Sequence, residues 1–128
     1  MFSPSEWEKI SGLISFVKMH LVYDGLVDKN DNRFPFEYHH DCVCSSSEGV
    51  SRQDVMTSLD EWGAKHGALA YACQAINGAC EYLVARARQE NPNIEMPNMV
   101  KDMVRDILLP LGKDEAFRVE PRRRSLGI

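Results

Sequence analysis

The sequence contains no apolar run long enough to cross a lipid bilayer. Apolar windows such as LISFVKMHLVY are interrupted by Lys18 and His20, and they fall well short of the ~20 residues that a membrane-spanning helix needs. An export signal would begin with basic residues followed by an apolar stretch, whereas this chain places Glu6 and Glu8 there. We therefore predict no membrane span and expect a cytoplasmic location.

Cysteine is scarce, with four residues in a chain of 128. Without an export signal these thiols are expected to stay reduced, because disulfides are rare in reducing compartments. Cys73 and Cys80 cannot pair if one helix carries both, since their Cα atoms would then lie about 10 Å apart and a disulfide allows about 7 Å. We expect no disulfide in this protein.

Basic residues are outnumbered by acidic ones, and the formal net charge at pH 7 is −4. The acidic excess lies in the first fifty residues, whereas the final segment, RVEPRRRSLGI, contains four arginines and one glutamate. An acidic body repels the phosphates of nucleic acid, so the body is not expected to bind it. The basic tail is instead expected to contact an acidic surface.

Two stretches near the ends of the chain are predicted to form helices. The first opens with a capping box of Ser3 and Glu6, and its apolar residues recur at spacings of three and four up to about Tyr23. The other begins at Pro97, which suits the first helical position, and ends at Pro110. Each stretch carries one apolar stripe that can face a core.

The stretch from 51 to 89 is predicted to form one long helix. Ser51 and Asp54 provide its N-terminal cap, and apolar or half-polar residues then alternate spacings of four and three without interruption. A kink near Gly63 is the alternative, since each glycine in a helix interior costs about 1 kcal/mol relative to alanine. The stripe consists of Val55, Leu59, Trp62, His66, Leu69, Cys73, Ile76, Cys80, Leu83 and Ala87.

The predicted fold is all-α: a small bundle of three main helices around one long central helix. Residues 24–50 are predicted as a long loop, because DKNDNRFPF and CSSSEG are rich in residues that break regular structure. Residues 1–112 would form a single helical domain, and 113–128 an irregular basic tail. The side chains expected to be buried together are Trp7, Ile14, Leu59, Leu69, Ile76, Leu83 and Met103.

The segment YHHDCVC, residues 38–44, gathers most of the side chains that could bind metal or act as nucleophiles. In an extended strand His40, Cys42 and Cys44 would share one side, with about 6.6 Å between neighbours, and His39 would face the other way. Structural zinc sites usually add a second closely spaced ligand pair, and the sequence has none. We interpret the segment as a polar loop with reduced thiols and predict no metal, cofactor or catalytic residue.

The rival hypothesis is a small zinc-binding module or an enzyme that uses His39, His40, Cys42 and Cys44. A catalytic cysteine needs a base and an orienting group around a cleft, and the sequence alone does not supply that geometry. For this reason the protein is not predicted to be an enzyme.

The functional prediction is a non-catalytic protein that binds another protein or itself. A helix of about 35 residues would span roughly 50 Å, which is more than a small domain needs for its own core. Such a protein would be a regulator, an immunity or anti-defence factor, or an accessory subunit of a larger assembly. The candidate partner-binding residues are Trp62 and His66 on the long helix and Arg122, Arg123 and Arg124 in the tail.

Overall fold

The structure is a computed structural model that describes residues 2–108. Within this range the chain forms five helices: α1 (Pro4–Tyr23), α2 (Phe36–Ser46), α3 (Arg52–His66), α4 (Ala68–Ala87) and α5 (Asn98–Leu108). No strand occurs in this part of the chain, which confirms the predicted all-α class. The predicted tail at 113–128, with Arg122, Arg123 and Arg124, and the last residues of the predicted domain lie outside the described residues.

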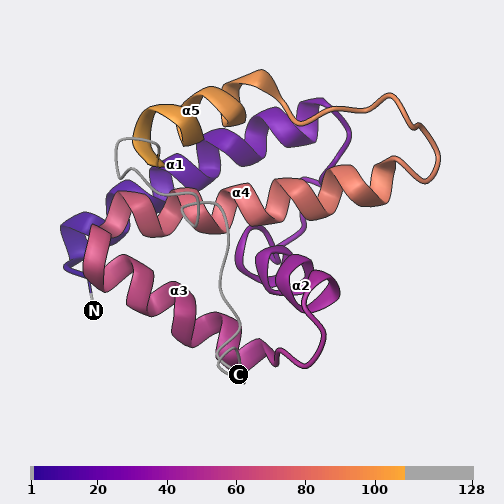
Figure 1. The fold of residues 1–128 in the computed structure, drawn as a ribbon. Coiled ribbons are helices and arrows are strands. Elements are labelled where there is room, and N and C mark those ends of the chain that lie inside the picture. The colour runs from indigo at the N-terminus through magenta and orange to yellow at the C-terminus, as the bar shows by residue number, and fades with distance from the viewer. Residues whose placement is uncertain (1, 109–128) are drawn as a thin grey trace.

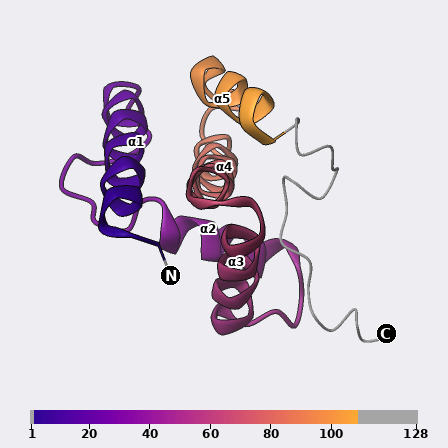
Figure 2. The same cartoon turned by 90° about the vertical axis from the view of Figure 1, so that its left-hand side faces the viewer.

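Helix α4 lies at the centre, and the four other helices pack around it (Figures 1 and 2). Every residue from Ala70 to Cys80 is buried, because small side chains such as Ala72, Ala75 and Ala79 let neighbouring helices approach from several directions. The surface of this helix is therefore largely covered by the chain's own helices.

The predicted helix starts are confirmed at α1 and α3. Ser3 caps α1 by accepting a hydrogen bond from the Glu6 amide, while the Glu6 carboxylate accepts one from the Ser3 amide at 2.9 Å. Ser51 and Asp54 form the same reciprocal pair at α3. These boxes satisfy backbone N–H groups that have no partner inside the helix, so the sequence alone defines both starts.

The predicted single helix from 51 to 89 is wrong, because the chain breaks at Gly67 into α3 and α4. Gly67 adopts φ 102° and ψ 170°, a conformation open essentially to glycine alone. Gly63, the predicted kink, lies inside α3, and its missing side chain leaves room for the ring of Tyr71. The break lets α3 turn away from the line of α4, as Figure 1 shows.

The predicted loop from 24 to 50 is also wrong in its second half, which forms α2. The buried residues of this helix are Tyr38, His39, His40 and Val43. α2 packs on α4, and Arg52 at the start of α3 forms ion pairs with Glu37 and Asp41 of α2. Three of the four buried side chains carry polar groups, so no clear apolar stripe marked this helix in the sequence. The bundle therefore has five helices and not three.

The predicted core is correct at Leu59, Ile76 and Leu83, which are all buried, and wrong at two positions. Trp7 is 39% exposed and Leu69 is 49% exposed. Trp7 lies at the edge of an aromatic group, with its ring centroid 5.7 Å from Phe2 and 6.1 Å from Tyr71. Leu69 lies in the first turn of α4, at the rim of the contact with α1. The other two predicted core residues, Ile14 and Met103, are partly buried and pack against the core.

Candidate functional site

The residues of the 38–44 segment lie on a helix, and this separates them. His39 faces α4, Cys42 reaches Glu81 of α4, and Cys44 packs in the small cluster of Val43 and Val55 between α2 and α3. Within residues 2–108 no three His, Cys, Asp or Glu side chains are placed to hold a metal ion. The four residues of the rival hypothesis therefore do not form one cluster.

His39 is buried against Gly78, and the imidazole occupies the space where a side chain at 78 would begin. Neither ring nitrogen has a hydrogen-bond partner among the described residues. Burial, assisted by the neighbouring His40, lowers the pKa of His39 to about 3. The ring is therefore neutral near pH 7 and acts here as a packing group.

The thiols are held in the protonated form. Cys42 donates to the Glu81 carboxylate at 3.8 Å, and Asn77 donates to the other oxygen of that carboxylate at 3.4 Å. Burial is the main cause that raises the pKa of Cys42, Cys73 and Cys80 to about 12. Because the thiolate is the nucleophilic form, these cysteines are poorly suited to nucleophilic chemistry near neutral pH.

The structure brings together the two predicted partner-binding residues of the long helix. The rings of Trp62 and His66 lie 4.2 Å apart, and the Trp62 indole donates to the backbone carbonyl of Ala70 at 3.1 Å across the break between α3 and α4. His66 also borders a cavity of about 310 Å³, together with Ile10 and Leu69. Both side chains are only half-buried, but the indole N–H is already used in holding α3 to α4.

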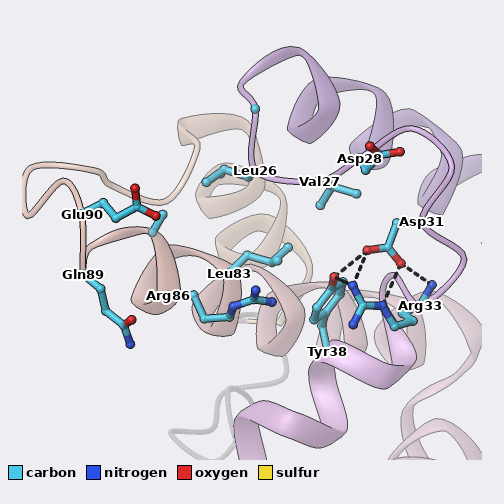
Figure 3. Close-up of a pocket in the computed structure, with 12 residues that line it drawn as sticks. Leu26, Val27, Asp28, Asp31, Arg33, Tyr38, Leu83, Arg86, Gln89 and Glu90 are labelled. Carbon is cyan, nitrogen blue, oxygen red and sulfur yellow. Dashed lines mark hydrogen bonds and ion pairs between the residues drawn. The ribbon is translucent and has the colours of Figure 1, made fainter.

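A second cavity, of about 370 Å³, lies between the segment 25–33, the start of α2 and the end of α4 (Figure 3). Arg33 forms an ion pair with Asp31 at 2.9 Å, and the Tyr38 hydroxyl donates to the same carboxylate at 2.5 Å. The hydrogen bond from Arg33 is the main cause that holds the pKa of Asp31 below its usual range. The Asp31 charge is therefore fully paired at one wall of this cavity.

Two tyrosines and two arginines form a stacked ladder beside this cavity. The Arg33 guanidinium lies 4.7 Å from the ring centroid of Tyr38, Tyr38 stacks on Tyr82 at 5.7 Å, and Arg86 lies 5.6 Å from the Tyr82 centroid. Sequence reasoning missed this site, because its parts come from residues about fifty positions apart. The only local signal was the polar run DKNDNR, in which Asp28 indeed caps a turn by accepting from the Asn30 amide at 2.8 Å.

A third feature is an exposed apolar surface on α1, which we call the α1 outer face and define by Phe16, Met19 and Tyr23. These side chains are 49%, 60% and 90% exposed. Their spacing of three and four residues places them on one side of the helix, away from the buried Val17 and Leu21. The sequence analysis predicted one apolar stripe for this helix, whereas the structure shows large apolar side chains on a second, exposed side.

Comparison with models of protein families, with curated proteins and with solved structures finds no match to this chain. Among the helices in the described range, none is long and apolar enough to cross a membrane. Its function is therefore inferred from its own residues and their geometry.

Proposed function

We propose that the protein is a non-catalytic helical protein that acts by binding another protein through the α1 outer face. One observation carries this proposal: three large apolar side chains, Phe16, Met19 and Tyr23, lie exposed on one side of one helix. Single exposed apolar residues are common on protein surfaces, but large ones grouped on one face are typical of interaction sites.

The geometry of this face suits a partner that offers an apolar groove. Anchors at positions i, i+3 and i+7 are the pattern by which a helix is recognised in such a groove. Gly12 lies on the same side one turn earlier, and nothing lies within 4 Å of the position that its Cβ would occupy. A partner backbone therefore has room to approach α1 closely at that point.

Two further observations support binding over catalysis. The side chains that could do chemistry at 38–44 are separated by α2, and the pKa of the Cys42 thiol is raised to about 12. A regulator, an immunity or anti-defence factor, or an accessory subunit would each act through such a surface. The cytoplasmic location expected from the sequence is part of this proposal, and self-association is the alternative form of binding.

The test compares the wild-type protein with the triple variant F16S/M19S/Y23S. Wild type should retain a partner from host extract, or form a dimer measured by light scattering, and the triple variant should lose this association. Because the three side chains are exposed, each change should alter the free energy of unfolding by only about 0.5 kcal/mol or less. Met56→Ser is the matched control, since Met56 is 44% exposed but lies on α3.

The tail arginines are tested separately with R122S/R123S/R124S. If they contribute, this variant should bind the same partner more weakly, and the difference should shrink as salt rises. A triple variant of the α1 outer face that still retains the partner would contradict the proposal. A wild-type protein that stays monomeric and partner-free, yet turns over a substrate in an activity screen, would favour the rival enzyme hypothesis.

A further inference from the structure

A shallow hollow of about 270 Å³ lies beside the α1 outer face, between α1 and the turn at residues 28–31. Met19, one of the three residues that define that face, forms part of its wall, and Val22 lines it three residues later. Ser15, Lys18 and Lys29 complete the lining. The hollow and the α1 outer face share Met19, so they form one surface that can receive an apolar side chain of a partner.

The wall of the hollow opposite α1 is fixed in place. Lys18 donates a hydrogen bond to the backbone carbonyl of Asp31 and so ties the turn to α1. Within the turn, the Asp31 amide donates to the Asp28 carbonyl at 3.0 Å, and the Asn30 amide donates to the Asp28 carboxylate at 2.8 Å. Lys29 lies between these hydrogen-bonded residues, so its backbone is held at the rim. A surface that is already ordered loses little conformational entropy on binding, which favours affinity.

The charged groups in the lining are both ammonium groups. Neither Lys18 nor Lys29 forms an ion pair with a carboxylate within residues 2–108. Asp28 and Asp31 instead line the cavity of about 370 Å³, where Asp31 is paired with Arg33. Since an ammonium group has three donors, Lys18 keeps two beyond the one that it gives to the Asp31 carbonyl. The hollow is therefore apolar at its wall and positive at its rim.

We propose that the α1 outer face receives an amphipathic helix of a partner protein, with an apolar side chain in this hollow and carboxylates against Lys18 and Lys29. This inference rests on the proposed function and names the chemistry of the partner. A helix suits the face because the apolar residues of α1 form a row at helical spacing, along which a second apolar row can pack. The carboxylates gain charged hydrogen bonds from the two ammonium groups.

Two other occupants fit the charges less well. A symmetric dimer centred on Met19 would bring the same lysines together from both copies, and like charges repel. An anionic membrane would be repelled by the body of the chain, because the first fifty residues contain eight acidic and four basic residues. The same excess disfavours a uniformly acidic partner, so the carboxylates are expected only where they meet Lys18 and Lys29.

The first experiment uses two peptides of about 18 residues, which is long enough to form a helix in water. Both carry the same row of leucines at helical spacing, flanked by glutamates in the acidic peptide and by lysines in the basic peptide. Fluorescence anisotropy with the full chain should show that the acidic peptide binds about fivefold more tightly, since an exposed ion pair changes the affinity by roughly two- to fivefold. This preference should shrink as salt rises.

The second experiment reverses one charge at the rim. Lys29→Glu changes an exposed side chain, so circular dichroism should show an unchanged fold. The variant should bind the acidic peptide about fivefold more weakly than wild type does, and it should prefer the basic peptide. Lys65→Glu is the matched control, because Lys65 is also exposed but lies on α3 outside the hollow. It should bind both peptides like wild type.

If wild type binds the two peptides equally and F16S/M19S/Y23S binds neither, the acidic partner is refuted while binding through the α1 outer face stands. Peptide binding that survives in this triple variant would place the peptides elsewhere and overturn the inference. So would no binding of either peptide, or a Lys29→Glu variant that behaves like Lys65→Glu. Vesicles of phosphatidylcholine and phosphatidylserine are the third probe, and a protein that binds them but neither peptide would assign the face to a membrane instead.

Discussion

At the scale of single residues, His39 of α2 packs directly against Gly78 of α4. A Cβ at position 78 would overlap the imidazole, so glycine is required there by packing and not by its backbone conformation. The imidazole in turn gives up hydrogen bonds to water at both nitrogens. Burying an unpaired polar group costs free energy, which makes this contact specific but sensitive to change.

The first prediction concerns Gly78→Ala. Overlap with His39 should lower the free energy of unfolding by about 1–3 kcal/mol, even though alanine is the better helix former. The control is Gly12→Ala, where the new methyl group meets nothing within 4 Å and should stabilise the helix by up to about 1 kcal/mol. Urea denaturation measures both values, and equal effects of the two substitutions would contradict the packing described for His39.

The second prediction concerns the pH dependence of stability. In the folded protein His39 has a pKa of about 3, whereas its usual value is 6.5. Between these values the unfolded chain binds a proton that the folded chain does not, so stability falls as the pH drops from 6.5 toward 3. From pH 6.5 to pH 5 this residue should lower the free energy of unfolding by about 2 kcal/mol.

His39→Leu isolates this effect, because leucine fills the space without a titratable group. The difference in stability between variant and wild type should grow in favour of the variant as the pH falls from 6.5 to 5. Asp31 should contribute little in this window, since the hydrogen bond from Arg33 holds the pKa of the Asp31 carboxyl below its usual range. Parallel loss of stability in the two proteins would show that His39 is not the group responsible.

At the scale of elements, the break at Gly67 decides how α3 and α4 are arranged. With φ 102° and ψ 170°, this residue lets the chain change direction within one peptide unit. Trp62 and Ala70 are then joined across the break by a hydrogen bond, and Tyr71 fills the space beside Gly63. The same turn places Arg52, at the far end of α3, next to α2.

The third prediction follows from this backbone conformation. Gly67→Ala should lower the free energy of unfolding by about 1–3 kcal/mol, because a residue with a Cβ is strained at this φ and ψ. The substitution adds only a methyl group, and no atom lies within 4 Å of the position that its Cβ would occupy. Thermal unfolding measures the change against Gly12→Ala. A rise in stability would mean instead that α3 and α4 prefer to form one continuous helix.

At the scale of the whole molecule, α4 is the element to which the others attach. Four helices contact it. One core cluster combines residues of α4 with residues of α1, α2 and α5, and a second combines residues of α4 with Ile10 of α1 and Leu59 of α3. The α1 outer face lies away from this buried centre, whereas the cavity at the C-terminal end of α4 borders the core through Val27, Tyr38 and Leu83. Binding at the α1 outer face is therefore compatible with an unchanged core.

The fourth prediction is that α4 is the last element to open. Amides of residues 72–80, which are buried on all sides, should exchange with solvent only through global unfolding. Their exchange free energies should therefore equal the free energy of unfolding from urea denaturation, whereas amides of α1 and α5 should exchange at lower free energies. Native-state hydrogen exchange measures this order, and faster exchange in α4 than in α1 would contradict the central role of α4.

The sequence by itself determined the all-α class and the start of three helices. The boxes Ser3 with Glu6 and Ser51 with Asp54 act within a few residues of the chain, and Pro97 directly precedes α5, so local pattern was sufficient there. Such signals depend on backbone groups and side chains that are neighbours in the sequence. They do not require knowledge of any other helix.

Only the tertiary structure decided the break at Gly67, the existence of α2 and the two candidate sites. α2 buries histidines and a tyrosine, which are counted as polar in a sequence, and it depends on space that Gly78 leaves in α4. The cavity combines Asp28 with Arg86, and the α1 outer face is exposed only because no helix of the described chain covers it. In each case the deciding free energy comes from contacts between residues far apart in the chain, which no local pattern records.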